Sequence, residues 1–317
     1  MREAPNITGE CLKVLFIGSK YYDQTVESGL NNTEHYIIGS AKQAGVELDA
    51  FHFDEYLLTN GEPGDDAVIR MAERGDYDFV LLDIYLASSV NPTCQTLKDL
   101  NIPIVCIWWD TVWQEQCEVG DTIQDFVSLN VSVDSGMCFS YSQKPEKYIY
   151  LWTPQDPSLY YPRGKDIEIA FYGRVGKLGR EKVVDRLCGL DGFVTLGGKN
   201  ENFVPKEKYA DQFGRTKIIV NFSESYSGHT QMVGHTMEAA LSGCLLLEQK
   251  GRETPGFFVK GQDYIEWSDV DDLMGKARYY MEHQEEAKEI ADRLLKKANK
   301  YYNCKVWWET VHRNIKR

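Results

Sequence analysis

The sequence predicts an α/β protein with two Rossmann-like domains, and two observations carry that prediction. Short apolar runs alternate with helical patterns along most of the chain, which is typical of parallel sheets covered by helices. A turn-rich stretch that contains Pro154 and Pro157 divides this alternation into two halves. We therefore expect a first domain over residues 1–152, a second over 153–302 and a C-terminal helical segment over 303–317.

Composition restricts the class of protein. A chain of 317 residues is long enough for two domains with buried cores. Its 48 acidic against 35 basic residues give a net charge of −13, which argues against a nucleic-acid partner. The sequence has no apolar signal core and no run of membrane-spanning length, and its eight cysteines show no metal-binding spacing. These features predict a cytoplasmic protein with reduced, mostly buried thiols.

The first half begins with a strand over 12–17 that ends in Gly18 and Ser19. No G-x-G-x-x-G follows, so the dinucleotide-binding fingerprint is absent. Loops at the carboxyl ends of parallel strands line the ligand crevice in such sheets, which makes Gly18 and Ser19 candidate ligand contacts. Further elements of this half are expected as helices over 33–44, 65–74 and 93–100 and as strands over 46–53, 78–83, 103–109, 131–133 and 136–140.

The strand over 103–109 ends in an aromatic and acidic cluster. Trp109 and Asp110 follow it directly, with Trp108 and Trp113 on either side. An acid and flat aromatic faces at the carboxyl edge of a parallel strand lie where ligands bind, and aromatic faces are common sugar platforms. The alternative is that the tryptophans belong to the core and that Asp110 caps the next helix.

The second half opens with a strand over 167–172 and a loop that is both basic and rich in glycine. Glycine lets the backbone approach an anion, and arginine offers a bidentate fork to phosphate. The loop is therefore a candidate phosphate site, although a solvated basic loop is the alternative. Its candidate residues are Gly173, Arg174, Lys177 and Arg180.

Residues 217–249 form the strongest motif of the chain. A strand over 217–222, a polar loop, a helix over 231–242 and a strand over 244–248 predict a parallel βαβ unit. The loop leads to a helix N-terminus, whose free amides and positive dipole end suit a phosphate. Glu238 lies within that helix with no evident residue to neutralise it.

Residues 234–247 resemble the donor segment of group 1 glycosyltransferases of GT-B fold, most closely the CgeB-like (spore-maturation-protein-like) family. The resemblance implies two Rossmann-like domains that face a cleft, with a C-terminal helix crossing back to the N-terminal domain. It also implies that Glu238 binds the ribose of a nucleotide-sugar and that the amides of Gly234, His235 and Thr236 face its diphosphate. Two departures stand out: His235 replaces a frequent arginine, and Thr230 replaces a second glutamate.

The sequence therefore predicts a glycosyltransferase that moves a sugar from a UDP- or GDP-sugar to a hydroxyl of a glycan or small molecule. No His/Asp cluster has plausible metal-ligand spacing, so we expect no metal and no cofactor. Asp110 is the candidate catalytic residue, and Gly18, Ser19 and Trp109 are candidate acceptor contacts. A GT-B nucleotide-sugar epimerase and a non-catalytic nucleotide- or glycan-binding protein remain alternatives.

Two expectations concern the C-terminal region. Residues 268–271 read as a capping box that starts a helix. Trp307 and Trp308 lie among basic residues, so the last segment either touches a membrane surface or packs on the N-terminal domain.

Overall fold

A computed structural model describes residues 11–83, 91–109, 123, 125–133, 144–197, 204–224 and 230–315. The chain divides into two compact units, each described by itself below. The first contains the described residues of 11–132, 144–151 and 304–315, and the second those of 152–303. Asp110 and the expected strand over 136–140 lie outside the described residues.

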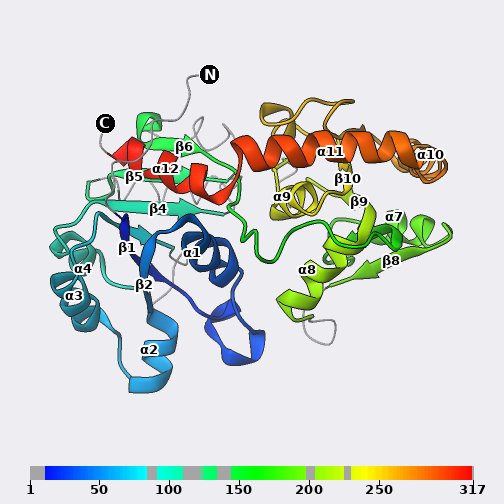
Figure 1. Cartoon of the computed structure of the whole chain (residues 1–317). Helices are drawn as coiled ribbons and strands as arrows, with labels where there is room; N and C mark the ends of the chain where they lie inside the picture. The colour runs from blue at the N-terminus through cyan, green and yellow to red at the C-terminus, as the bar shows by residue number, and fades with distance from the viewer. Residues whose placement is uncertain are drawn as a thin grey trace. The chain divides into compact units, whose positions relative to one another are not determined.

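The first unit is built on a six-stranded sheet in which all neighbouring strands are parallel, in the order β2-β1-β3-β4-β5-β6 (Figure 1). Both faces of its central strands are buried, which explains why they read as continuous apolar runs. The strands are β1 (Lys13–Gly18), β2 (Glu47–His52), β3 (Phe79–Leu82), β4 (Ile104–Trp108), β5 (Leu129–Ser132) and β6 (Tyr148–Tyr150).

Helices cover both faces of this sheet. One core joins alternate strand residues to α3 and α4, and on the other face Phe79 of β3 meets Trp308 of α12. The C-terminal helix α12 also contacts α1, where the Trp308 indole donates to Ser40 Oγ at 3.2 Å. The helices are α1 (Ser40–Ala44), which continues a π-helical segment (Glu34–Gly39), α2 (Phe53–Asn60), α3 (Asp65–Arg74), α4 (Cys94–Asp99) and α12 (Cys304–Ile315).

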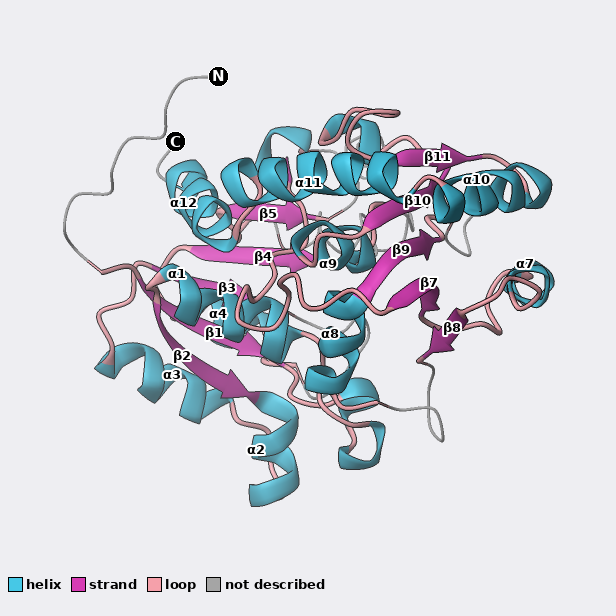
Figure 2. Cartoon of the chain, turned by 45° about the vertical axis from the view of Figure 1, so that its right-hand side comes forward, coloured by secondary structure: helices cyan, strands magenta, loops and turns pink. Residues whose placement is uncertain are grey.

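The second unit has a five-stranded parallel sheet in the order β11-β10-β9-β7-β8 (Figure 2). Its strands are β7 (Ile167–Tyr172), β8 (Phe193–Leu196), β9 (Thr216–Asn221), β10 (Leu245–Gln249) and β11 (Ile265–Trp267).

Helices pack on both faces of this second sheet as well. Side chains of α7 and α10 join one apolar core, whereas α8 packs on the opposite face, where Phe213 contacts the ring of Tyr172. The helix α9 contacts β9, β10 and α11. The helices are α7 (Arg180–Leu187), α8 (Lys206–Arg215), α9 (Gly234–Leu241), α10 (Val270–Glu282) and α11 (Gln284–Tyr301).

Two separate parallel sheets, each covered by helices, confirm the predicted α/β class with two Rossmann-like domains. The C-terminal helix belongs to the first unit, as the GT-B resemblance implies. Trp307 and Trp308 are 0% and 1% exposed, so they form part of the first unit's interior and offer no aromatic surface to a membrane.

Two elements of the first unit differ from the sequence prediction. The helix α2 begins at Phe53, where we expected the strand to end, because Asp54 turns inward and accepts hydrogen bonds from the loop after β1. Residues 148–150 form the edge strand β6, where the sequence predicted no strand.

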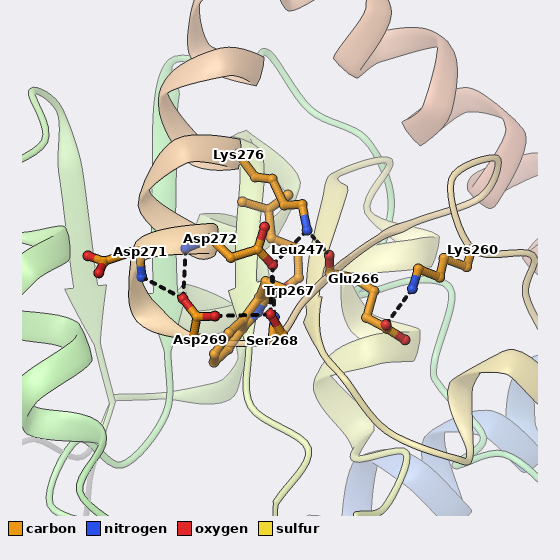
Figure 3. A network of polar contacts seen from close by, with 9 residues as sticks. All are labelled: Leu247, Lys260, Glu266, Trp267, Ser268, Asp269, Asp271, Asp272 and Lys276. Atoms are coloured by element: carbon orange, nitrogen blue, oxygen red, sulfur yellow. Dashed lines mark hydrogen bonds and ion pairs between the residues drawn. The ribbon is translucent and has the colours of Figure 1, made fainter.

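The expected capping box is shifted by one residue. Asp269, and not Ser268, is the N-cap of α10, since its carboxylate accepts from the amides of Asp271 and Asp272 at 3.0 and 2.9 Å (Figure 3). Asp272 reaches back to the Ser268 amide at 2.9 Å, which completes the reciprocal arrangement. Lys276 holds this end of the helix to β11 by bonding the Asp272 carboxylate and the Glu266 carbonyl.

Candidate active site

The carboxyl edge of the second unit's sheet brings most of the predicted donor residues together. Gly173 follows β7 with φ +152°, and a Cβ atom there would lie 3.1 Å from Cε1 of His235. Only glycine therefore lets the end of β7 approach the first turn of α9 this closely. The end of β7 and the first turn of α9 are thus in direct contact.

The N-terminus of α9 is open and surrounded by cations. No side chain in the described part of the chain caps this helix. The Thr236 amide donates to the Val233 carbonyl at 3.1 Å, so the amides of Gly234 and His235 are the ones open to a ligand. Burial lowers the pKa of His235, and the positive charges of Arg180, Lys206 and Lys177 lower it further against the opposing effect of Glu238. Three cations, two from the basic loop after β7 and one from the start of α8, therefore act electrostatically on the same helix turn.

The predicted cations differ in exposure. Arg174 is exposed and makes no hydrogen bond or ion pair with the described residues. Arg180 is 8% exposed, lies 5.0 Å over the ring of Phe222, and its Nη2 donates to the Glu224 carbonyl at 3.4 Å. Arg180 is therefore held in place by its own unit, whereas Arg174 is free to meet a ligand.

Glu238 is fully buried and has two protein partners that the sequence did not indicate. Its Oε1 accepts from the Tyr160 hydroxyl at 2.7 Å and from Lys206 Nζ at 3.1 Å. Burial alone would raise its pKa, but Lys206, His235 and Tyr160 together lower it, so the group is a carboxylate at neutral pH. The expectation that nothing neutralises Glu238 is wrong, because α8 and the segment before β7 supply the partners.

Thr236 faces the sheet. Its Oγ1 accepts from Asn221 Nδ2 at 3.2 Å and lies 3.4 Å from Oε2 of Glu248, and its side chain is fully buried. Burial raises the pKa of Glu248 to about 7, although Asn221, Thr236 and Thr254 lower it in part. This buried cluster anchors the first turn of α9 to the ends of β9 and β10.

Gly18 and Ser19, predicted as acceptor contacts, lie against other residues of the first unit. A Cβ atom at Gly18 would lie 2.4 Å from the Phe16 ring, so this position needs glycine for a close approach. Ser19 is buried, and its Oγ lies 2.6 Å from Oδ2 of Asp54. Asp54 also accepts from the amides of Lys20 and Tyr21, so it fixes the loop that follows β1.

The aromatic residues after β4 separate into two kinds. Trp108 is 4% exposed, and its indole donates to Asn130 Oδ1 at 2.8 Å, which places it in the core. Trp109 is partly buried and lies 6.0 Å from the ring of Tyr36. Asp110, the predicted catalytic residue, is outside the described residues.

Sequence reasoning missed Tyr160, Lys206 and Glu248. Lys206 begins a helix on the same edge as the basic loop, and this position is the one signal that could have drawn attention to it. Tyr160 lies 78 residues from its partner, and no local pattern marks it.

Within the described ranges, no three His, Cys, Asp or Glu side chains come together as metal ligands. The helices described here include none that is long and apolar enough to cross a membrane.

The second unit matches a known family. The model of the family described as "Glycosyl transferase-like" matches residues 165–313, which include the basic loop and α9. A search of curated protein sequences finds no match to the chain.

Three solved structures share the fold of the whole chain. Sucrose-phosphate synthase from Thermosynechococcus elongatus superposes with a TM-score of 0.64 at 11% identity, over 96% of this chain and 99% of that one. HepE from Anabaena, in complex with UDP-glucose, superposes with a TM-score of 0.62 at 13% sequence identity, over 96% of this chain and 98% of HepE. T4 phage BGT, in complex with its UDP-glucose substrate, superposes with a TM-score of 0.60 at 12% sequence identity, over 96% of this chain and 99% of BGT.

These matches cover nearly the full length of both partners, and they share the two-sheet architecture described above. The chain therefore has the GT-B fold, and its residues 165–313 match the glycosyl transferase-like family.

Proposed function

We propose that this chain transfers a sugar from a nucleoside-diphosphate sugar to a hydroxyl acceptor. The observation that carries the proposal is the convergence of Lys177, Arg180 and Lys206 on the open N-terminus of α9. A helix N-terminus with nearby cations is a binding site for phosphate groups. The structures of HepE and of BGT, which share the fold, hold UDP-glucose, and this supports a UDP-sugar as the donor.

The proposed chemistry follows from where charge develops. As the bond between the sugar and the diphosphate breaks, negative charge grows on the leaving diphosphate. Fixed cations and amides at that position stabilise the transition state more than the ground state. In this proposal Arg174, Lys177 and Arg180 take the diphosphate together with the amides of Gly234 and His235, and Gly173 allows the close approach. The Thr236 amide is already bonded to the Val233 carbonyl.

Glu238 is proposed to bind the ribose. A carboxylate at this site offers strong acceptors to the ribose hydroxyls, and Lys206 with Tyr160 keeps it ionised and fixed in orientation. The first unit is proposed to present the acceptor, a glycan or small molecule, with Gly18, Ser19, Trp109 and Asp110 at its carboxyl edge. Within the GT-B group we place the chain nearest the CgeB-like proteins on the motif at 234–247.

The experiment is a panel of nucleotide-sugars incubated with the chain, with and without candidate glycan acceptors. Release of nucleoside diphosphate together with a glycosylated product supports the proposal. Formation of an epimeric nucleotide-sugar would support the epimerase alternative instead, and binding without turnover would support a non-catalytic role. Since cations of the chain are proposed to stabilise the leaving group, turnover should survive EDTA. Loss of turnover that Mn²⁺ restores would contradict this site chemistry.

A further inference from the structure

Asp83 occupies a central position at the carboxyl edge of the first unit's sheet. It follows β3 directly, and its amide donates to the carbonyl of Ile17 on β1 at 2.8 Å. Since β3 lies between β1 and β4, Asp83 stands between the loop that begins at Gly18 and the segment that contains Trp109. These are the two segments that we assign to the acceptor.

The carboxyl group of Asp83 is buried among weak partners. The residue is 5% exposed, and no cation in the described part of the chain offsets its charge. The Trp109 indole lowers the pKa of Asp83, although its N–H makes no hydrogen bond of ordinary geometry with the described residues. Burial raises the pKa of Asp83 to about 7 against the opposing effect of Trp109, and its charge contributes to raising the pKa of the Cys106 thiol on β4.

Two other buried carboxylates of the chain, those of Asp54 and Glu238, have stronger partners. Asp54 accepts three hydrogen bonds from the loop after β1, and Glu238 is held by Lys206 and Tyr160. Burying a carboxyl group is costly unless it is paired or hydrogen-bonded. A carboxyl group that is kept desolvated at a ligand-binding edge without such partners is suited to proton transfer near neutral pH.

We propose that Asp83 accepts the proton from the acceptor hydroxyl that binds beside Trp109. This role rests on the proposed function. The acceptor oxygen bonds to the anomeric carbon while the bond between that carbon and the diphosphate oxygen breaks. The electron pair of the broken bond leaves with the nucleoside diphosphate, and the hydroxyl proton moves to the Asp83 carboxylate.

The test compares Asp83→Asn with Asp78→Asn in the full chain. Asp78 precedes the same strand at its opposite end, where its exposed carboxylate accepts from the Lys13 amide. With donor and acceptor present, Asp83→Asn should lower kcat by about 100-fold or more, as expected for loss of a general base. Its affinity for nucleoside diphosphate should stay within about twofold of wild type, and Asp78→Asn should behave like wild type.

The pH profile provides a second readout. Wild-type kcat should rise about tenfold per pH unit below pH 7 and level off above it, because the ionised carboxylate is the active form. This rising limb should be absent in Asp83→Asn. Normal kcat in Asp83→Asn, or an unchanged limb, would overturn the role of Asp83 while leaving the proposed function intact. If the wild-type chain neither binds nucleoside diphosphate nor turns over any donor, the proposed function fails and this role falls with it.

Discussion

At the scale of single residues, Glu238 and Asp83 show how surroundings decide what a buried carboxyl group can do. Lys206 and Tyr160 lower the pKa of Glu238, so it is ionised and able to accept hydrogen bonds from a sugar ring. Asp83 lacks such partners among the described residues, and burial raises its pKa to about 7. We therefore assign binding to Glu238 and proton transfer to Asp83.

The donor assignment predicts a difference between two variants. Glu238→Gln removes the charge and should weaken both nucleoside and nucleoside diphosphate, since hydrogen bonds to a charged group contribute about 1.5–3 kcal/mol. Arg174→Ala should weaken only the diphosphate form. Calorimetric titration of both ligands measures this, with the exposed Glu207→Gln as control. Wild-type affinity of Glu238→Gln for both ligands would contradict the ribose assignment.

Asp83 also predicts how stability depends on pH. Its pKa is about 7 in the folded chain, above its ordinary value of 3.8, so the folded state resists ionisation and loses stability as pH rises through 7. Between pH 6 and pH 8.5, Asp83→Asn should gain on the order of 1 kcal/mol relative to wild type. Urea unfolding at both pH values measures the gain, with Asp78→Asn as control. An equal effect at both pH values would show that Asp83 is already ionised at pH 6.

At the scale of elements, α9 and α10 begin in opposite ways. Asp269 caps α10 and satisfies two of its first amides, whereas no described side chain caps α9. The first turn of α9 is instead anchored from behind through Thr236, Asn221 and Glu248. An open but anchored helix start is what a phosphate site requires, because the amides must be both available and fixed.

The cap of α10 can be tested by mutation. Asp269→Ala should lower the free energy of unfolding by about 1 kcal/mol, since it leaves two amides without their acceptor. Asp271→Ala is the matched control, because Asp271 forms only an exposed ion pair with Arg186. Its loss should lower the free energy of unfolding by only a few tenths of a kcal/mol. Urea denaturation of the full chain gives both values. An equal or larger effect of Asp271→Ala would show that the cap is not the dominant interaction.

At the scale of the whole molecule, the last helix of the chain belongs to the unit that contains its beginning. Trp307 and Trp308 of α12 are buried in the first unit, and Trp308 contacts Phe79 of β3 and Ser40 of α1. The chain therefore closes the first unit's core only after the second unit has been completed. Stability of the first unit depends on residues more than 200 positions away from its central strand.

Trp308→Ala should consequently destabilise the first unit by about 3–5 kcal/mol, as large core truncations do. Donor binding is assigned to the second unit, so nucleoside diphosphate affinity should be unchanged at temperatures where the variant is folded. Thermal denaturation and calorimetric titration give the two values, and Lys305→Ala, on the exposed face of α12, is the control. Loss of nucleotide affinity in folded Trp308→Ala would contradict the assignment of the donor site to the second unit alone.

Local pattern was sufficient for much of this protein. Most of the strands and helices, the glycine at 173, the basic loop after β7 and the start of α9 are properties of neighbouring residues, so periodicity and turn chemistry predicted them, whereas α2 and β6 were missed. The GT-B architecture followed from the motif at 234–247. Even the error at the α10 cap was a shift of a single residue, since Ser268 and Asp269 are both good N-caps.

The tertiary structure alone decided which charges meet. Tyr160 and Lys206 donate hydrogen bonds to Glu238 although they lie 78 and 32 residues from it in sequence. Asp54 accepts a hydrogen bond from Ser19 in the loop after β1, 35 residues away. The lack of a cation beside Asp83 among the described residues depends likewise on what β1 and β4 place next to it. Such contacts depend on how strands and helices pack and not on spacing along the chain, and the pKa of a carboxyl group follows from its burial and its partners. Sequence could therefore point to the sheet edges where we propose that ligands bind, while packing set the surroundings of each acid and so the role that we propose for it.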